Sequence, residues 1–461
     1  MGILEKLKMR RTERWLILLA ALVILIARAS LALAEGDDPA TALIPVAQFS
    51  VVFLIVHLIL CWLLPYADCI MLPVVALLNG LGILMIHRLD PLLITQRDGT
   101  IAEAYLAPGQ LQWTMIALAM MFAVLLIIRS HRVFTRYSYL LGILGLVLLA
   151  LPMVWPGSAG SDAKIWISLG PFSVQPGEFS KILLLLFFAQ LLVNKRARLN
   201  VAGARILGLD FPRLRDLGPI LFVWAIALVI MAGENDFGPA LLLFSTVLGM
   251  LYLATGRTSW LLIGGLLVAI GGYGVYMISA KIQSRVNNFL DPLANYDGTG
   301  YQLSQALFGM SWGGITGTGL GRGYPDEVPV AHTDFILAAI AEELGLVGIT
   351  AILLLFAVLI IRGMRTAMLV RDSYGKLVAA GLSLTLAIQV FVVTAGNSAL
   401  MPMTGLTTPF ISHGGSSLIA NYILLALLLR ISDTARRPTV RATTPSTTAV
   451  PVPGLRQEVQ R

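Results

Sequence analysis

Charged residues are scarce in this chain. Only 13% of its 461 residues are Asp, Glu, Lys or Arg, whereas soluble domains carry about 25%. Together with 57% hydrophobic residues, this shortage excludes a soluble globular protein, a disordered chain and a fibrous repeat. Cysteine is scarce as well: Cys61 and Cys69 form neither a disulfide framework nor a CxxC metal pair. No His/Cys spacing typical of zinc occurs.

Long apolar runs are what the chain does have. They predict an all-α polytopic membrane protein with about twelve transmembrane helices. The runs cover residues 15–34, 45–64, 69–86, 111–128, 137–155, 179–193, 217–232, 237–254, 259–279, 336–361, 377–396 and 413–431. Gly, Pro, Asn and Asp separate them, as is typical of loops. Residues 432–461 are rich in Pro, Thr and Arg and predict a disordered, basic cytoplasmic tail.

The distribution of positive charge predicts the orientation. If residues 1–14 are cytoplasmic, the cytoplasmic segments hold 25 of the 33 Lys and Arg residues, and the opposite side holds 7. The remaining one, Arg28, lies inside the first span. The positive-inside rule therefore predicts that both termini are cytoplasmic. The net charge of +8 is then explained by topology and anionic lipid, not by nucleic-acid binding.

Polar residues concentrate in the loops on the opposite, extracytoplasmic side, above all in the large loop 280–335. Asp334 ends this loop just before an apolar run, where partial burial would raise the pKa of the carboxyl and suit it to proton abstraction. The alternative is a helix N-cap, and both can hold at once. Such a carboxylate could also hold a hard cation such as Mg²⁺ beside a phosphate.

Further candidate groups lie near the outer ends of the spans. Lys164 and Lys181 are cations suited to phosphate, although Glu178 and Lys181, at i,i+3, could instead form a surface ion pair of little energetic value. The segment SHGGSS (412–417) opens a span and could cradle an anion or simply cap a helix. The Gly-rich run 313–323 is no Walker or Rossmann fingerprint and indicates tight turns or close backbone approach to a ligand. These groups fit a lipid-linked phosphate substrate, and they also fit the mouth of a transporter.

Several long motifs resemble the SEDS family (shape, elongation, division and sporulation), which includes RodA and FtsW. The matching stretches are DAKIWISLGPFSVQPGEFSK (162–181), ENDFGPAL (234–241), 285–321, VPVAHTDFILAAIAEELGLVG (328–348) and NSALMPMTGLTTPFISHGGSSL (397–418). They occur in the order of the family. The sequence departs from the frequent pattern at Ile165, where Arg is common, at Pro239, where Thr is common, and at His413, where Tyr is common.

The resemblance implies a peptidoglycan glycosyltransferase of the bacterial cell membrane. Such an enzyme polymerises lipid II at the outer membrane face, for cell elongation and shape or for division. The family's catalytic aspartate falls on Asp334. The residues expected to bind substrate are Lys164, Trp166, Gln175, Glu178, Lys181, Arg285, Gln302, His332, Glu343, Ser412, Gly414, Gly415, Ser416 and Ser417.

The resemblance also implies partners and a mechanism. The partners are lipid II, the undecaprenyl-pyrophosphate-linked glycan, the membrane and a class B penicillin-binding transpeptidase. The reaction is inverting and needs no organic cofactor, while a divalent cation, Mg²⁺ or Mn²⁺, would bind at Asp334. Two alternatives stay open: a lipid II flippase and a non-catalytic scaffold for the transpeptidase. The family core has ten spans, so residues 69–431 are expected to form it and residues 1–68 to add two further spans.

Overall fold

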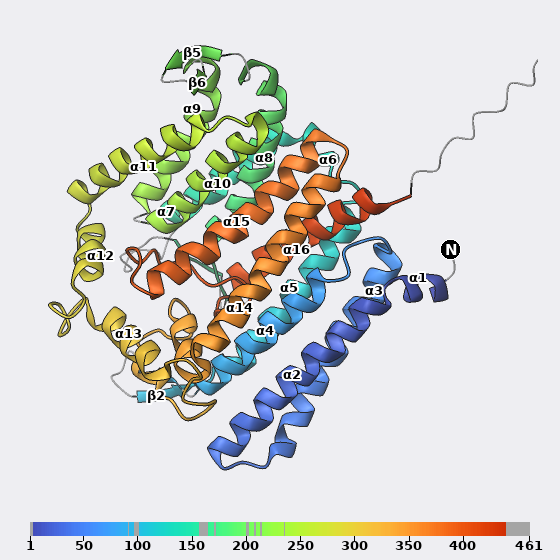
Figure 1. The fold of residues 1–461 in the computed structure, drawn as a ribbon, viewed down its shortest axis with the longest axis vertical. Coiled ribbons are helices and arrows are strands. Elements are labelled where there is room, and N and C mark those ends of the chain that lie inside the picture. Colours follow the sequence, from blue (N-terminus) through green and yellow to red (C-terminus); the bar gives the residue numbers. More distant parts are fainter. Residues whose placement is uncertain are drawn as a thin grey trace, which may run out of the picture.

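The computed structural model describes residues 3–90, 92–95, 101–155, 165–169, 172–199, 202–206, 209–212, 214–234 and 236–438. Long helices dominate it (Figure 1). The long apolar ones are α2 (Arg11–Glu35), α3 (Leu43–Leu63), α4 (Met71–Arg88), α5 (Ala107–Ile127), α7 (Ser138–Val154), α8 (Pro176–Leu199), α9 (Leu214–Gly233), α10 (Phe237–Thr255), α11 (Ser259–Ile278), α14 (Ile336–Leu369), α15 (Ser373–Asn397) and α16 (Gly415–Arg436). Each predicted apolar run lies on one of them, which confirms the all-helical polytopic fold.

Within the described residues, ten helical segments are long and apolar enough to cross a membrane. The remaining two apolar segments, Ser138–Val154 and Leu221–Gly233, are shorter. The count of twelve spans therefore stays a prediction. The predicted start of the tail falls too early, because α16 continues through Arg436. Residues 439–461 lie outside the described residues.

Short elements fill the connections. The helical ones are α1 (Ile3–Met9), η1 (Pro39–Ala42), α6 (Val133–Arg136), α12 (Ala280–Leu290), α13 (Tyr301–Gly313) and η2 (Pro325–Glu327). The strands form three antiparallel hairpins: β1 (Leu92–Thr95) with β2 (Ile101–Ala104), β3 (Ile167–Leu169) with β4 (Phe172–Val174), and β5 (Ala202–Ile206) with β6 (Leu209–Pro212). The large loop 280–335 thus has helical structure of its own, in α12 and α13. These two helices lie at the end of the bundle opposite β5 and β6 (Figure 1).

Helix α14 is broken at Gly345, and the Gly-rich segment fills the break. Gly345 has φ 65° and ψ −169°, a backbone conformation that is open essentially to glycine alone. The N–H groups of Thr318 and Gly319 donate to the carbonyl oxygens of Glu342 and Glu343, each at 3.0 Å. In return, the N–H of Leu346 donates to the carbonyl of Gly314 at 3.0 Å. The glycines of 313–321 therefore allow close backbone approach to a broken helix.

The N-terminal helices α2 and α3 pack beside α4 at the edge of the bundle (Figure 1). Close packing depends on Gly80 of α4, since a Cβ atom there would lie 2.1 Å from Cδ1 of Ile24. Just before α2, the buried Arg10 side chain donates to the carbonyl oxygens of Leu64 and Ala67 at 2.9 and 3.0 Å. The pair is thus held to the core near the middle of α2 and at its start.

Candidate active site

Asp334 lies in the segment between η2 and α14, at the end of the bundle that gathers the loops 280–335 and 398–414. Its side chain is half-buried. It does not cap α14: the helix begins at Ile336, its N-cap is Phe335, and no side chain accepts a hydrogen bond from the first turn. The N-cap interpretation of Asp334 is therefore wrong, and its carboxyl group does not stabilise the start of the helix.

The backbone just before Asp334 is held by three hydrogen bonds. Ser412 Oγ donates to the carbonyl of Thr333 at 2.6 Å, and the N–H of His413 donates to the carbonyl of His332 at 2.8 Å. Gln302 Nε2 donates to the carbonyl of Pro329 at 2.9 Å. Ser412 and Gln302 were both predicted to bind substrate. In the structure they hold the backbone that carries Asp334.

Arg285 of α12 lies close to Asp334. A Cβ atom on Gly405 would lie 3.1 Å from Arg285 Nη2 and 3.9 Å from Asp334 Oδ2, so one glycine touches both side chains. Gly405 has φ +73°, which also favours glycine at this position. Arg285 Nη1 donates to the carbonyl of Thr404 at 3.1 Å, which fixes the guanidinium against the 398–414 loop. The sequence-based placement of Arg285 in the site agrees with this geometry.

Burial shifts the pKa values of these groups. It raises the pKa of Asp334 to about 6, against the opposing effects of the Arg285 guanidinium and a hydrogen bond with Thr333. Burial likewise lowers the pKa of Arg285, an effect that the carboxylates of Asp236 and Asp334 oppose. A carboxyl group with a pKa just below neutral is ionised at pH 7 and yet basic enough to accept a proton in a reaction.

Two acidic residues of the short loop between α9 and α10 join this cluster. Burial raises the pKa of Asp236 to about 6, and Lys281 and Arg285 oppose that rise. Burial, with the neighbouring Asp236 charge, raises the pKa of Glu234 to about 8. Neither was predicted as a site residue. The sequence signal for them was an acidic pair in a short loop between two spans. Ionisable groups are costly near the membrane and therefore indicate a functional site.

Lys181 and Glu178 form an ion pair of 2.6 Å near the start of α8. Their side chains are only 9% and 7% exposed, so the predicted alternative of a surface pair of little value is wrong. Lys181 Nζ also donates to Gln389 Oε1 at 3.3 Å, and Gln389 Nε2 donates to the carbonyl of Thr407 at 2.8 Å. This network joins α8, α15 and the 398–414 loop, and it occupies the ammonium group that was expected to hold phosphate.

The hydroxyl groups of the SHGGSS segment also have protein partners. Ser416 Oγ accepts the N–H of Gln175 at 2.9 Å, and Ser417 Oγ lies 2.7 Å from Thr407 Oγ1. Gly414 N–H donates to Gln110 Oε1 at 3.4 Å, and a Cβ atom on Gly415 would lie 2.3 Å from the Trp113 ring. The segment therefore fastens the start of α16 to α5 and to the residues before α8.

The remaining predicted residues fall in different surroundings. Glu343 is fully buried and accepts a 2.8 Å hydrogen bond from Arg88 Nε, so its contacts are those of a packing ion pair. Trp166 is 41% exposed, so its side chain is accessible. His332 stays neutral at pH 7 because burial, with the nearby His413, lowers its pKa to about 4. Lys164 lies outside the described residues.

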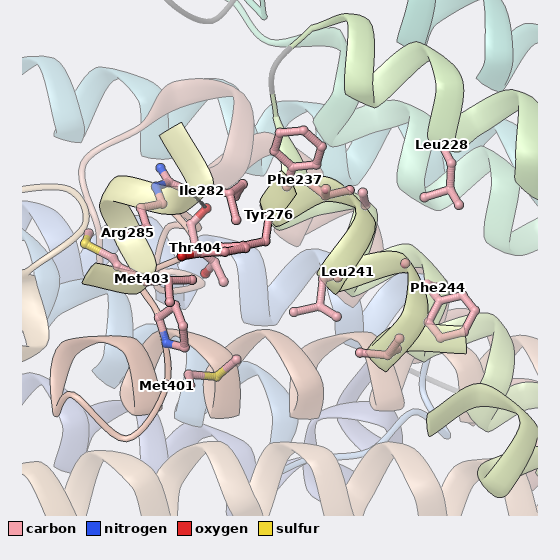
Figure 2. Close-up of a pocket in the computed structure, with 18 of the residues that line it drawn as sticks. Leu228, Phe237, Leu241, Phe244, Tyr276, Ile282, Arg285, Met401, Met403 and Thr404 are labelled. Carbon is pink, nitrogen blue, oxygen red and sulfur yellow. Dashed lines mark hydrogen bonds between the residues drawn. The ribbon is translucent and has the colours of Figure 1, made fainter. Parts of the chain in front are cut away.

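An apolar cavity of about 450 Å³ opens beside Arg285 (Figure 2). Arg285 and Thr404 lie at one end of it, and Leu228 and Phe244 lie toward the other (Figure 2). Its walls come from α9, α10, α11, α12 and the 398–414 loop, and they are lined mostly by hydrophobic side chains. A cavity of this size and lining suits a hydrocarbon chain whose charged end meets the guanidinium.

No group of three or more His, Cys, Asp and Glu side chains placed to hold a metal ion occurs among the described residues. Asp334 offers one carboxylate beside the cavity. Magnesium commonly binds proteins through one or two carboxylates together with substrate phosphates, so the residues present fit a cation that arrives with a phosphorylated substrate.

Comparison with known proteins gives a consistent result. A RodA named as a peptidoglycan glycosyltransferase in Mycobacterium bovis is 53% identical over 384 residues, which cover 83% of this chain and 81% of the relative. The corresponding protein of Mycobacterium leprae is 47% identical over 433 residues, covering 93% of this chain and 92% of the relative. Stage V sporulation protein E of Bacillus subtilis is 31% identical over 372 residues, covering 80% of this chain and 98% of the relative.

Solved structures share the fold. One chain comes from a study of how a peptidoglycan synthase complex coordinates polymerization and crosslinking; it superimposes with a TM-score of 0.62 at 25% identity, over 81% of this chain and 99% of that one. The rod shape determining protein RodA of Thermus thermophilus superimposes with a TM-score of 0.56 at 23% identity, over 81% and 98%. The profile of the FtsW, RodA and SpoVE cell cycle proteins matches residues 68–437. The chain therefore belongs to the FtsW/RodA/SpoVE family.

Proposed function

We propose that this protein is a peptidoglycan glycosyltransferase that polymerises lipid II into glycan strands for cell shape. The observation that carries the proposal is the placement of Asp334 beside Arg285, where the apolar cavity opens. The family supports the same activity, since relatives at 53% and 47% identity are named peptidoglycan glycosyltransferase RodA. A relative named FtsW is 32% identical, which is well below the 53% of the relative named RodA. This difference favours a role in shape over one in division.

Asp334 is proposed to act as the general base. The acceptor is a sugar hydroxyl of lipid II, and its oxygen attacks the anomeric carbon of the growing strand as its proton passes to the Asp334 carboxylate. Proton transfer to a positioned side chain contributes typically about 10²–10⁴-fold in rate. The braces from Ser412, His413 and Gln302 hold the carboxylate in place, so little ordering is needed when substrate arrives.

Arg285 is proposed to stabilise the leaving group. As the glycosidic bond forms, the bond from the anomeric carbon to the pyrophosphate oxygen breaks, and negative charge collects on the polyprenyl pyrophosphate. The guanidinium, fixed by Thr404, is a preorganised partner for that charge. An α-linked donor and a β-linked product require one displacement, so no enzyme nucleophile is needed.

The apolar cavity is proposed to hold the polyprenyl chain. Its walls belong to α9, α10 and α11, which are apolar helices, and Arg285 stands at one end. A lipid in the cavity would place its pyrophosphate on the guanidinium. A divalent cation bound by Asp334 and the pyrophosphate would supply further charge neutralisation; loss of polymerisation on chelation, with recovery on adding Mg²⁺ or Mn²⁺, would support its presence.

The site is proposed to face the outside of the bacterial cell membrane, with both termini in the cytoplasm. The Lys and Arg distribution supports this orientation. The partner is proposed to be a class B penicillin-binding transpeptidase, since a similar chain was solved in a peptidoglycan synthase complex. Lipid II and the undecaprenyl-pyrophosphate-linked glycan are the proposed substrates.

The substitution Asp334→Asn tests the base. The amide keeps the shape of the side chain and cannot accept the proton, so we expect polymerisation to fall by at least about 10²-fold. Glycan products made from labelled lipid II by purified protein with its transpeptidase partner are resolved on a gel. Asp326→Asn is the matched control, because it makes the same change at an exposed carboxylate of the same large loop. Glycan chains of normal length and yield from the Asn variant would refute the assignment.

A further inference from the structure

A second cavity lies between the N-terminal helix pair and the core. Its lining residues are distant in sequence from those of the proposed polyprenyl site. It measures about 310 Å³. Residues of α2, α3, α4 and α5 line it, including Ile24, Arg28, Gln48, Ile83 and His87. It shares no lining residue with the cavity beside Arg285. The two cavities are thus separate sites.

Arg28 is the exceptional residue of this cavity. It belongs to the apolar helix α2, where a cation is costly unless it is paired. Its side chain is only 16% exposed, and its nearest carboxylate, Glu35, is 3.7 Å away, too far for a hydrogen bond. Nη1 is buried and has no hydrogen-bond partner. A residue that lines a mostly apolar cavity therefore carries a buried donor without a hydrogen-bond acceptor among the described residues.

The cavity lies at the same end of the bundle as Asp334. His87 lines it near the end of α4, and the next residue, Arg88, pairs with Glu343 in the first part of α14. Arg28 is seven residues from the end of α2, which is roughly 10 Å along a helix axis. If the end of α2 lies at the membrane surface, this distance places Arg28 just below the lipid headgroups. Its extended side chain can then reach a lipid phosphate.

We propose that a phospholipid of the surrounding bilayer binds in this cavity, with an acyl chain against Ile24 and Ile83 and its phosphate on Arg28. The apolar lining and the single under-used guanidinium match the two parts of such a lipid, since Arg binds phosphate through a planar fork of donors. The lipid would fill the space between the N-terminal pair and the core. The volume lies at the low end of the range of ligand sites, about 300–1,000 Å³.

The occupant is a bilayer phospholipid rather than the polyprenyl substrate, because the substrate pyrophosphate must reach Arg285. The test compares the two sources of phosphate. The purified full chain is titrated with phosphatidylglycerol, and bound lipid is counted by native mass spectrometry. We expect Arg28→Gln to weaken binding of the tightest phosphatidylglycerol by about tenfold, the loss expected for a charge-assisted contact. Undecaprenyl phosphate should bind the wild type and this variant equally.

Matched variants separate the cavity from general effects of charge. Arg11→Gln removes the same charge from an exposed position at the other end of α2 and should leave lipid binding unchanged. Ile83→Trp fills the cavity with Arg28 intact and should also release the lipid, so the proposal stays testable if Arg28→Gln folds poorly. Wild-type phosphatidylglycerol binding by both Arg28→Gln and Ile83→Trp would overturn the proposal. Loss of undecaprenyl phosphate binding in these variants would instead overturn the choice of a bilayer phospholipid as the occupant.

Discussion

At the scale of single residues, Asp334 owes its position to backbone contacts made by side chains that are distant in sequence. Ser412 and Gln302 hold the carbonyl groups of Thr333 and Pro329. A substitution at either position would therefore displace the carboxylate without removing any group that touches substrate. Loss of activity in such variants is expected to resemble loss of the base itself, which makes activity alone a poor guide to residue roles here.

The pH dependence of polymerisation follows from the Asp334–Arg285 pair. The base acts only when ionised, so the rate should fall as the pH drops through about 6, the pKa that burial gives Asp334. The Arg285 guanidinium opposes that rise. Arg285→Gln should therefore raise the pKa further and move the acidic limb of the profile to higher pH, in addition to lowering the rate. The measurement is the initial rate of lipid II consumption from pH 4.5 to 8, normalised to each variant's maximum, a range chosen to bracket that pKa of about 6.

Arg322→Gln is the control for this experiment, because Arg322 is an exposed arginine of the same large loop. Its profile should coincide with that of the wild type. An unshifted acidic limb in Arg285→Gln would show that the guanidinium does not act on the titrating group.

Lys181 gives a second prediction, in which the structure changes the sequence-based expectation. A cation that only held pyrophosphate could be removed without harm to folding. Because Lys181 is buried in an ion pair with Glu178, Lys181→Ala should instead destabilise the protein by about 3–5 kcal/mol, the cost of leaving one buried charge unpaired. The thermal midpoint of unfolding in detergent measures this.

The double variant Lys181→Met with Glu178→Gln removes both charges and should recover most of the lost thermal stability. If Lys181→Ala melted at the wild-type temperature and yet failed to polymerise lipid II, Lys181 would act on substrate rather than on the fold.

At the scale of elements, the break in α14 determines the arrangement of the large loop. Breaking a helix inside a membrane protein frees backbone groups, and these need partners from protein. The Gly-rich segment supplies them, and its tight approach leaves no room for side chains: a Cβ atom on Gly345 would lie 2.2 Å from the N atom of Gly317. Arg88, by pairing with Glu343, ties α4 to the first half of the broken helix.

Gly345→Ala should therefore be strongly destabilising. The backbone conformation alone costs about 1–3 kcal/mol for a residue other than glycine, and contact with Gly317 adds to it. The thermal midpoint in detergent should fall markedly below that of Gly274→Ala, whose added methyl group would meet nothing within 4 Å. Equal midpoints for the two variants would show that the purified protein does not keep this break.

At the scale of the whole molecule, polar networks hold both ends of the bundle. At the end opposite Asp334, the buried Asp68 side chain accepts hydrogen bonds from Arg362 and Arg436 at 2.7 and 2.6 Å. The N–H of Tyr66 donates to Asp433 at 3.0 Å. These contacts join the start of the core to α14 and α16. The part of the chain just after the last predicted span is thus fastened to the core.

The orientation of these two ends is testable with introduced cysteines. Asn295 and Ser373 are exposed and lie at opposite ends of the bundle. Because positive charge stays in the cytoplasm, an impermeant maleimide added to intact cells should label Asn295→Cys and not Ser373→Cys, while both should react after lysis. The parent chain, with Cys61 and Cys69 retained, is the control for background. Labelling of Ser373→Cys in intact cells would refute the predicted topology.

Much of the fold was determined by local sequence. Each apolar run became a helix because a backbone in lipid must satisfy its own hydrogen bonds, and the run length sets the helix length. The motifs also placed Asp334 and Arg285 in one loop region. Hydropathy could not detect the break at Gly345, because it depends on backbone groups of residues 313–319 that approach from outside the helix.

The roles of the polar residues were decided by tertiary structure. The sequence by itself determined the helical class, the apolar cores of the spans and the family, since these rest on composition, periodicity and motif order. It could not separate side chains that meet substrate from those that meet the protein, because Lys181, Ser412 and Glu343 find partners in distant segments of the chain, at Gln389, Thr333 and Arg88. The cavity around Arg28 likewise exists only where four helices meet, and no local pattern encodes such a meeting.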